Sequence, residues 1–358
     1  MDNHTSEPTD APTRLEIAIR KTAPGTSLRL ALDMVIAGRM GALICVGDTD
    51  AVLAAGNDGF PLNISFTANR LFELSKMDGA IVVDKDLTQI LRANFHLNPD
   101  PSLKTSETGM RHRTAARMSL LTKAMVISVS ERRQVVNVYV DGHSFQLRTV
   151  AAVMSSVNQL LTTLQTSRQA IDRSLLRLTS LELDNYVTLG DIATILTNFE
   201  VLMTANDELR GCIAELGSEG AVIEMQRQQL VAGMDDEYTL LVRDYAADSS
   251  IESAARIRES FRELRGKQAQ MPSPAQVGET LGFKGLQEDS VMKTLGLRTL
   301  SRINVVREGM AEKIVDEYGS LRELLDDIEQ NPERLDDLGV NNPSVLANSL
   351  YRMWGKKE

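Results

Sequence analysis

The sequence lacks any apolar run close to the roughly 20 residues that a membrane-spanning helix needs. Its first stretch, MDNHTSEPTDAPTR, has no apolar core, so it does not resemble a signal peptide. We expect residues 1–13 to form a disordered polar tail. We therefore expect a cytoplasmic protein, with association with the nucleoid as a further option.

Metal-binding side chains and positive charge are also scarce. Neither the two cysteines, Cys45 and Cys212, nor the four histidines have the spacing of zinc ligands, which argues against such a centre and fits a reducing compartment. The net charge is −10, whereas a protein that simply coats nucleic acid is basic. Any contact with DNA must therefore be local, through a small patch or backbone amides.

Up to about residue 150, short β-branched runs alternate with helical stretches, which predicts an α/β domain with a central mixed sheet. Because the last three expected strands lie close together in sequence, we expect an antiparallel ribbon at one edge of the sheet. The expected strands are 42–47, 79–83, 125–129, 135–140 and 145–150, and the expected helices are 67–76, 86–93 and 111–123.

After residue 150 the strand pattern disappears, and apolar residues recur at helical spacing, which predicts an all-α region. Thr188 is expected to cap one of its helices, with Asp191 completing an acidic capping box. From residue 285 onward, short helices separated by turns predict a small helical module. The expected domains are thus 14–150, a helical spine over 151–284, and 285–358.

Two motifs in the first domain point to phosphate chemistry. In Asp78-Gly79-Ala80, the glycine would let a nucleotide approach the backbone beside a carboxylate. In the segment Thr105-Ser106-Glu107-Thr108-Gly109-Met110-Arg111-His112-Arg113-Thr114-Ala115, a helix start with free amides is combined with arginine forks, and both bind phosphate. Taken alone, the first motif is also typical of a turn with a capping aspartate, and the second of a solvated basic turn. Together they predict a phosphoester site of unspecified type.

With these motifs at this separation, the stretch from about Leu28 to Val150 resembles the diadenylate cyclase domain, whose signatures are DGA and RHR within GTRHRTA. Residues 98–102 and 128–133 also match, and the rest of the chain resembles the remainder of the DisA family of DNA integrity scanning proteins. The resemblance implies condensation of two ATP molecules into cyclic di-AMP and two pyrophosphates. It also implies domains that face each other in a homo-oligomer, which is an octamer in the family.

The resemblance also implies roles for individual residues. Asp78, Arg111, His112 and Arg113 would be catalytic, with Asp78 holding a divalent cation, Mg²⁺ or Mn²⁺, near the attacking 3′-hydroxyl. Met110 stands where the family usually has threonine, so a hydroxyl is lost from the expected site. The expected ATP-binding residues are Asp78, Gly79, Ala80, Leu97, Gly109, Met110, Arg111, His112, Arg113, Thr114 and Ser130.

The C-terminal module resembles a tandem helix-hairpin-helix domain, which presents glycine-rich backbone to DNA phosphates. The best match begins at Leu338 and has asparagine in place of the second hairpin glycine, and 302–309 would be the first hairpin. From residue 300 onward 8 basic residues face 12 acidic ones, so a helical cap that serves assembly is the alternative. The expected DNA-binding residues are Gly339, Asn341, Arg352, Lys356 and Lys357.

Other interpretations remain open. A DNA-binding scaffold that senses ATP without turnover would need the arginines but not Asp78. A cyclase for guanine nucleotides would keep both motifs, whereas the resemblance is to the adenine-specific family. Arg258, Arg262 and Arg265 share one face of an expected helix, which favours a solvated face over a contact with DNA.

Overall fold

The computed structural model describes residues 13–267, 272–307, 309–328, 330–331, 334–335, 338–340 and 342–354. The chain forms two compact units, one of residues 1–158 and 210–224, the other of residues 159–209 and 225–358. The expected disordered tail lies outside the described residues, except for Thr13, which caps the first helix.

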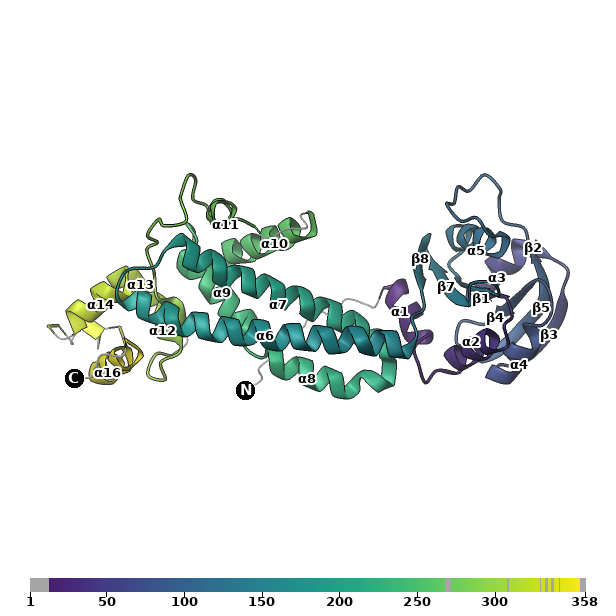
Figure 1. Cartoon of the computed structure of the whole chain (residues 1–358), viewed down its shortest axis with the longest axis horizontal. Coiled ribbons are helices and arrows are strands. Elements are labelled where there is room, and N and C mark those ends of the chain that lie inside the picture. Colours follow the sequence, from purple (N-terminus) through teal and green to yellow (C-terminus); the bar gives the residue numbers. More distant parts are fainter. Residues whose placement is uncertain are drawn as a thin grey trace. The chain divides into compact units, whose positions relative to one another are not determined.

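The first unit contains an eight-stranded sheet (Figure 1) with the order β2-β5-β4-β1-β6-β7-β8, and β3 also pairs with β5. The pair β1–β4 is parallel and its neighbours are antiparallel, which confirms the expected mixed sheet. The run β6–β7–β8 is the expected antiparallel ribbon at one edge. The strands are β1 (Ala42–Val46), β2 (Gly56–Asn57), β3 (Phe60–Ser65), β4 (Ala80–Val83), β5 (Gln89–Leu97), β6 (Met125–Ser130), β7 (Val135–Val140) and β8 (His143–Gln146).

Helices cover both faces of this sheet (Figure 1). Helices α1 (Arg14–Lys21), α2 (Ser27–Ala37) and α4 (Ala68–Leu74) contribute to the core on one face, and α3 (Thr49–Ala54) and α5 (Met110–Leu121) to the core on the other. Along β1, Ile44 packs into the first core and Leu43 and Cys45 into the second. A strand that is buried on both faces needs apolar residues throughout, which is why β1 and β4 read as continuous apolar runs.

Two elements were predicted wrongly. Residues 86–93 were expected to be helical, yet β5 begins at Gln89. Leucine and isoleucine at helical spacing suggested the helix, but pairing with β3 and β4 on either side overrides that local preference. The last expected strand, 145–150, ends early because β8 stops at Gln146 and α6 begins at Val150.

The chain after β8 is helical, as expected, and its described residues add only one isolated β-bridge. Thr188 and Asp191 form the predicted reciprocal cap, with hydrogen bonds in both directions. No helix in the described ranges is long and apolar enough to cross a membrane. The helices are α6 (Val150–Leu183), α7 (Leu189–Leu216), η1 (Gly217–Gly220), α8 (Ala221–Val231), α9 (Met234–Tyr245), α10 (Ile251–Lys267), α11 (Pro274–Thr280), α12 (Leu297–Ser301), α13 (Met310–Tyr318), α14 (Leu321–Ile328) and α16 (Pro343–Trp354).

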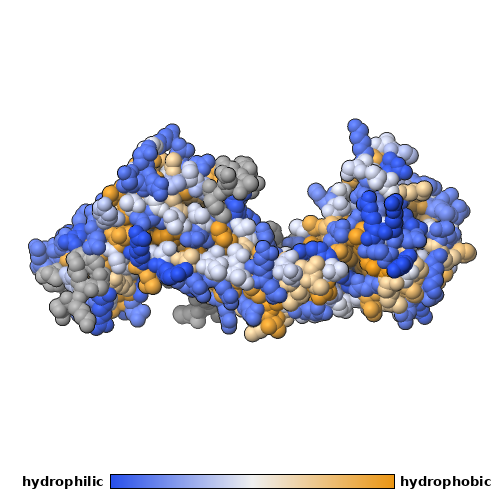
Figure 2. Space-filling model, viewed as in Figure 1, coloured by the Kyte–Doolittle hydropathy of each residue, from blue (hydrophilic) through white to orange (hydrophobic). Residues whose placement is uncertain are grey.

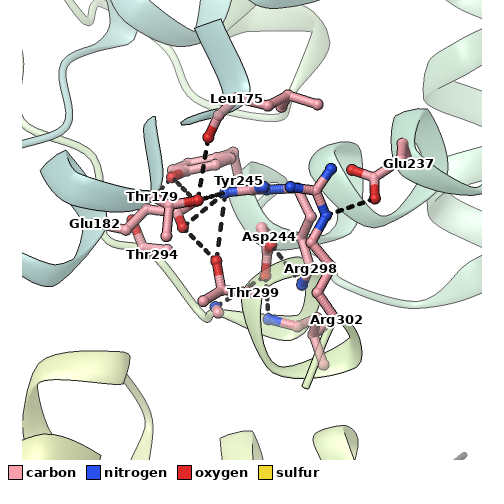
Figure 3. Close-up of polar contacts among 12 residues, drawn as sticks. Leu175, Thr179, Glu182, Glu237, Asp244, Tyr245, Thr294, Arg298, Thr299 and Arg302 are labelled. Atoms are coloured by element: carbon pink, nitrogen blue, oxygen red, sulfur yellow. Dashed lines mark hydrogen bonds and ion pairs between the residues drawn. The ribbon is translucent and has the colours of Figure 1, made fainter. Parts of the chain in front are cut away.

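A buried polar network joins α6, α9 and α12 inside the second unit (Figure 3). Arg298 and Glu182 form an ion pair of 2.9 Å, and both side chains are fully buried. Thr299 and Tyr245 also donate hydrogen bonds to Glu182. Asp244 accepts from three backbone amides at the start of α12, and burial raises its pKa to about 7. The start of α12 is therefore fixed by carboxyl groups on two other helices.

The surface in the view of Figure 2 is mostly hydrophilic, with smaller apolar groups between the polar ones. The arginine face of α10 is only partly solvated. Arg262 is exposed, as predicted, but Arg258 pairs with Asp235, and Arg265 lies 3.0 Å from Glu200. Two of the three guanidinium groups are therefore engaged within the helical unit.

Candidate active site

A cavity of about 690 Å³ opens at the edge of the sheet where β1 and β4 begin and β5 and β6 end. Pockets for small molecules usually measure roughly 300–1,000 Å³. Every predicted ATP-binding residue lines this cavity except Arg113, which is exposed. The two motifs, which are far apart in sequence, therefore meet at one site.

The first motif forms a tight turn with an open carboxylate. Gly79 has φ +84°, and a Cβ there would lie 2.8 Å from the carbonyl carbon of Asn94. The side-chain amide of Asn94 donates a 2.8 Å hydrogen bond from Nδ2 to the backbone oxygen of Asp78. The Asp78 side chain is 93% exposed. The backbone is held in place while the carboxylate remains free to contact a ligand.

The second motif begins α5 without a side-chain cap. Gly109 is the N-cap, no side chain bonds to the first amides, and no acidic residue lies in the first turn. The loop before the helix is fixed by Arg117, whose guanidinium donates to the backbone oxygens of Leu103 and Pro101 at 3.0 Å each. Free amides and the positive end of the helix dipole at this position favour an anion.

Arg111 brings a cation close to the open carboxylate. Its Nη2 atom lies 3.9 Å from Oδ1 of Asp78, and the arginine side chain is 42% exposed. An exposed pair at this distance contributes little stability, so both groups are available to a substrate. A Cβ on Gly41 would overlap Nη1 of Arg111, so the missing side chain at this position makes room for the guanidinium.

Several lining residues were not predicted. Phe95 was missed because it lies in the second half of β5, a strand that was not predicted. Glu131 and Arg132 lie within the matched stretch 128–133, and that match was the available signal. The additional lining residues are Leu43, Phe95, His96, Asn98, Val129, Glu131 and Arg132.

The oxygen ligands in this cavity suit a metal ion that is held jointly by the protein and a bound nucleotide. Among the described residues, no three His, Cys, Asp or Glu side chains are grouped as metal ligands. Mg²⁺ is commonly bound by one or two carboxylates together with substrate phosphates. Asp78 alone could supply the protein's share of such a site.

In the C-terminal module, glycines with left-handed backbone precede two helices. Gly309 has φ +74° and caps α13, and Gly339 has φ +91° and lies shortly before α16. Arg352 is exposed in the last turn of α16. Asn341, Lys356 and Lys357 lie outside the described residues.

Residues 29–144 match the family described as DisA bacterial checkpoint controller nucleotide-binding, and residues 147–290 match the DisA bacterial checkpoint controller linker region. The DNA integrity scanning protein DisA of Symbiobacterium thermophilum is 38% identical over 335 residues, which cover 94% of each chain. The chain belongs to the DisA family. This membership confirms the enzyme class that the resemblance implied, a diadenylate cyclase.

Two further DisA proteins show the same extent of similarity. That of Carboxydothermus hydrogenoformans is 35% identical and covers 94% of this chain and 95% of its own, and that of Kineococcus radiotolerans is 36% identical over 92% of each. DacA from Staphylococcus aureus, a solved structure, is 24% identical over 38% of this chain and 91% of its own, with a TM-score of 0.29. The similarity to the DisA relatives thus spans nearly the whole chain.

Proposed function

We propose that this DisA-family chain condenses two ATP molecules into cyclic di-AMP and two pyrophosphates, using the cavity around Asp78 and the start of α5. The observation that carries the proposal is the approach of Asp78 to Arg111 within one cavity that an uncapped helix N-terminus also lines. Nucleotidyl transfer depends chiefly on positioning and charge neutralisation, and this arrangement supplies both.

In the proposed reaction, the 3′-hydroxyl oxygen of one ATP forms a bond to the α-phosphorus of the other. The bond from that phosphorus to the bridging oxygen breaks, and pyrophosphate leaves. Asp78 lies close to the attacking hydroxyl and takes up its proton directly or orients it. Arg111, His112, Thr114 and Ser130 hold the phosphates. A second attack in the opposite sense closes the ring.

A divalent cation, Mg²⁺ or Mn²⁺, fits beside Asp78. When bound, it lowers the pKa of the attacking hydroxyl and neutralises phosphate charge. The open carboxylate of Asp78 supports this placement.

One cavity holds one ATP, so ring closure requires two domains that face each other. We therefore propose a homo-oligomer, and the octamer of the family is compatible with it. Arg113 is exposed outside the cavity of its own domain, and this position suits contact with the phosphates of the nucleotide opposite.

We also propose that the C-terminal module contacts DNA phosphates through helix-hairpin-helix turns and couples turnover to DNA structure. Gly309 supports this, because it has a left-handed backbone and a Cβ added there would meet nothing within 4 Å. Electrophoretic mobility shifts with branched and linear DNA across a salt series test the proposal, since phosphate contacts weaken with salt. Absence of salt-sensitive binding to either DNA would favour the assembly cap.

The cyclase proposal is tested by incubating the protein with ATP or GTP and Mg²⁺ or Mn²⁺ and separating the products by chromatography. Asp78→Asn should bind ATP yet form no cyclic product. Arg111→Ala should bind ATP about 10-fold or more weakly, because a charge-assisted phosphate contact is lost. Asp86→Asn changes an exposed carboxylate outside the cavity and is the matched control. Undiminished turnover by both site variants would refute the assignment, and binding without turnover by the unmodified chain would support the ATP-sensing scaffold.

A further inference from the structure

A chain of hydrogen bonds inside the domain holds His112, and its other members, Tyr139 and Glu107, lie outside the two signature triplets. Its Nδ1 atom lies 2.9 Å from the hydroxyl oxygen of Tyr139. The Tyr139 hydroxyl donates to Oε1 of Glu107, also at 2.9 Å. Glu107 is in the loop before α5 and His112 is in its first turn, so the fold brings the distant Tyr139 of β7 to the start of this helix.

The direction of each hydrogen bond follows from the charges. Tyr139 is 2% exposed, and burial, reinforced by the carboxylate of Glu107, raises its pKa, so the phenol stays neutral. Its single hydroxyl proton points to the carboxylate, the stronger acceptor. The phenol oxygen can then only accept from His112, which places a proton on Nδ1. The Nδ2 atom of Asn137 lies 3.4 Å from the same nitrogen and, as a donor, would favour an unprotonated Nδ1. The contact with Tyr139 is shorter, at 2.9 Å, and we take it to decide the tautomer.

The imidazole is also confined on its other sides. The His112 and Tyr139 rings meet edge to face, with centroids 6.4 Å apart. A Cβ on Gly109 would lie 3.2 Å from Cδ2 of His112, the ring carbon bonded to Nε2. With Nδ1 engaged by Tyr139, Nε2 is the ring nitrogen left for a ligand in the cavity that His112 lines.

We propose that Tyr139 and Glu107 are positioning residues that keep a proton on Nδ1 of His112 and reserve Nε2 for the phosphate chain of ATP. The proposal rests on the cyclase function proposed above. A neutral ring would offer a lone pair at Nε2, and a charged ring would offer an N–H. Any proton that His112 exchanges with ATP or with departing pyrophosphate therefore passes through Nε2. Histidine ligands in other sites are commonly fixed in the same way through the second nitrogen.

Kinetics of Tyr139→Phe test this role, because phenylalanine keeps the ring and loses only the hydroxyl. The expected result is a fall in kcat of about 10-fold, with the KM for ATP changed by less than about two-fold. Tyr186→Phe, at a residue 66% exposed, is the matched control and should change neither value. In a His112→Ala background Tyr139→Phe should have no further effect, since Tyr139 acts through His112. An equal loss in both backgrounds would overturn the proposal.

A second measurement does not depend on turnover. ¹⁵N NMR of the histidine rings reports which nitrogen carries the proton, and His112→Ala identifies the signal of His112 among the four histidines. The expected signal is that of the Nδ1–H form, and Tyr139→Phe should convert it at least partly to Nε2–H. Glu107→Gln keeps an acceptor for the hydroxyl and should shift the signal less. A wild-type ring protonated only on Nε2 would contradict the proposal even if cyclic di-AMP forms. If the expected tautomer is observed but no cyclic product forms, the proposed cyclase function is refuted while the proposed hydrogen-bonded chain still holds.

Discussion

Replacing Arg298 with methionine measures how strongly the helical unit depends on its buried charges. The substitution keeps much of the apolar volume but leaves Glu182 and Asp244 buried without their cation. Removing one partner of a buried ion pair typically costs about 3–5 kcal/mol. Each kcal/mol lowers the melting temperature by roughly 2–4 °C in a unit of this size, so the expected fall is roughly 6–20 °C.

Differential scanning calorimetry of the full chain should resolve this fall. A bound ligand raises the melting temperature of the unit that binds it. Added ATP should therefore shift the transition of the sheet unit, and the transition that does not shift belongs to the helical unit. Combining Arg298→Met with Glu182→Leu should recover much of the lost stability, because an apolar pair can replace a buried ion pair at little cost. A loss below about 1 kcal/mol in the single variant would refute the reasoning, since it would place the pair among weak surface contacts.

Three further predictions concern single positions. Gly79→Ala should destabilise the sheet unit by about 1–2 kcal/mol in thermal unfolding, because a side chain at φ +84° is strained and would crowd Asn94; an unchanged midpoint would contradict the turn geometry. Burial raises the pKa of Asp244 to about 7 from 3.8, so the native state keeps a proton that the unfolded state loses, and the stability of the helical unit should fall as pH rises from about 4 to about 7. Asp244→Asn should flatten that slope, and an unaltered slope would exclude Asp244 as its source. Met110→Thr should leave stability within about 0.5 kcal/mol, because Met110 is 78% exposed, and should lower the KM for ATP by restoring a hydroxyl; a higher KM would show that the methionine itself assists binding.

Strands that are buried on both faces could be predicted from the sequence. Strands that form only because neighbouring strands pair with them were missed. β1, β4, β6 and β7 are compact apolar runs, and burial from two sides requires that composition. β3 contains Pro61 and alternates between exposed and half-buried positions, so its local pattern is weak. β5 becomes a strand because β3 and β4 flank it, a reason that no window of a few residues contains.

The candidate site likewise has features that the local sequence predicts and features that depend on the fold. The two motifs together predicted a phosphate site, because glycine, arginine and a helix start carry that chemistry within a few residues of one another. The 3.9 Å approach of Asp78 to Arg111 depends on β4 and α5 beginning at the same edge of the sheet, and only the family resemblance anticipated it. The support from Tyr139 gave no local signal, since this residue belongs to neither motif and lies 32 positions from Glu107. Glu107 stands within the second motif, but no role was predicted for it.

The absent side chain at Gly41 has a consequence for comparing genomes. A larger residue there would overlap the guanidinium of Arg111 first, and its Cβ would lie 3.3 Å from the backbone oxygen of Val129, so we expect the arginine to be displaced from the phosphates. Chains that keep both signature triplets but carry a bulkier residue at this position would look competent by motif alone. The residue at position 41 therefore helps to distinguish active cyclases from relatives that have lost the activity.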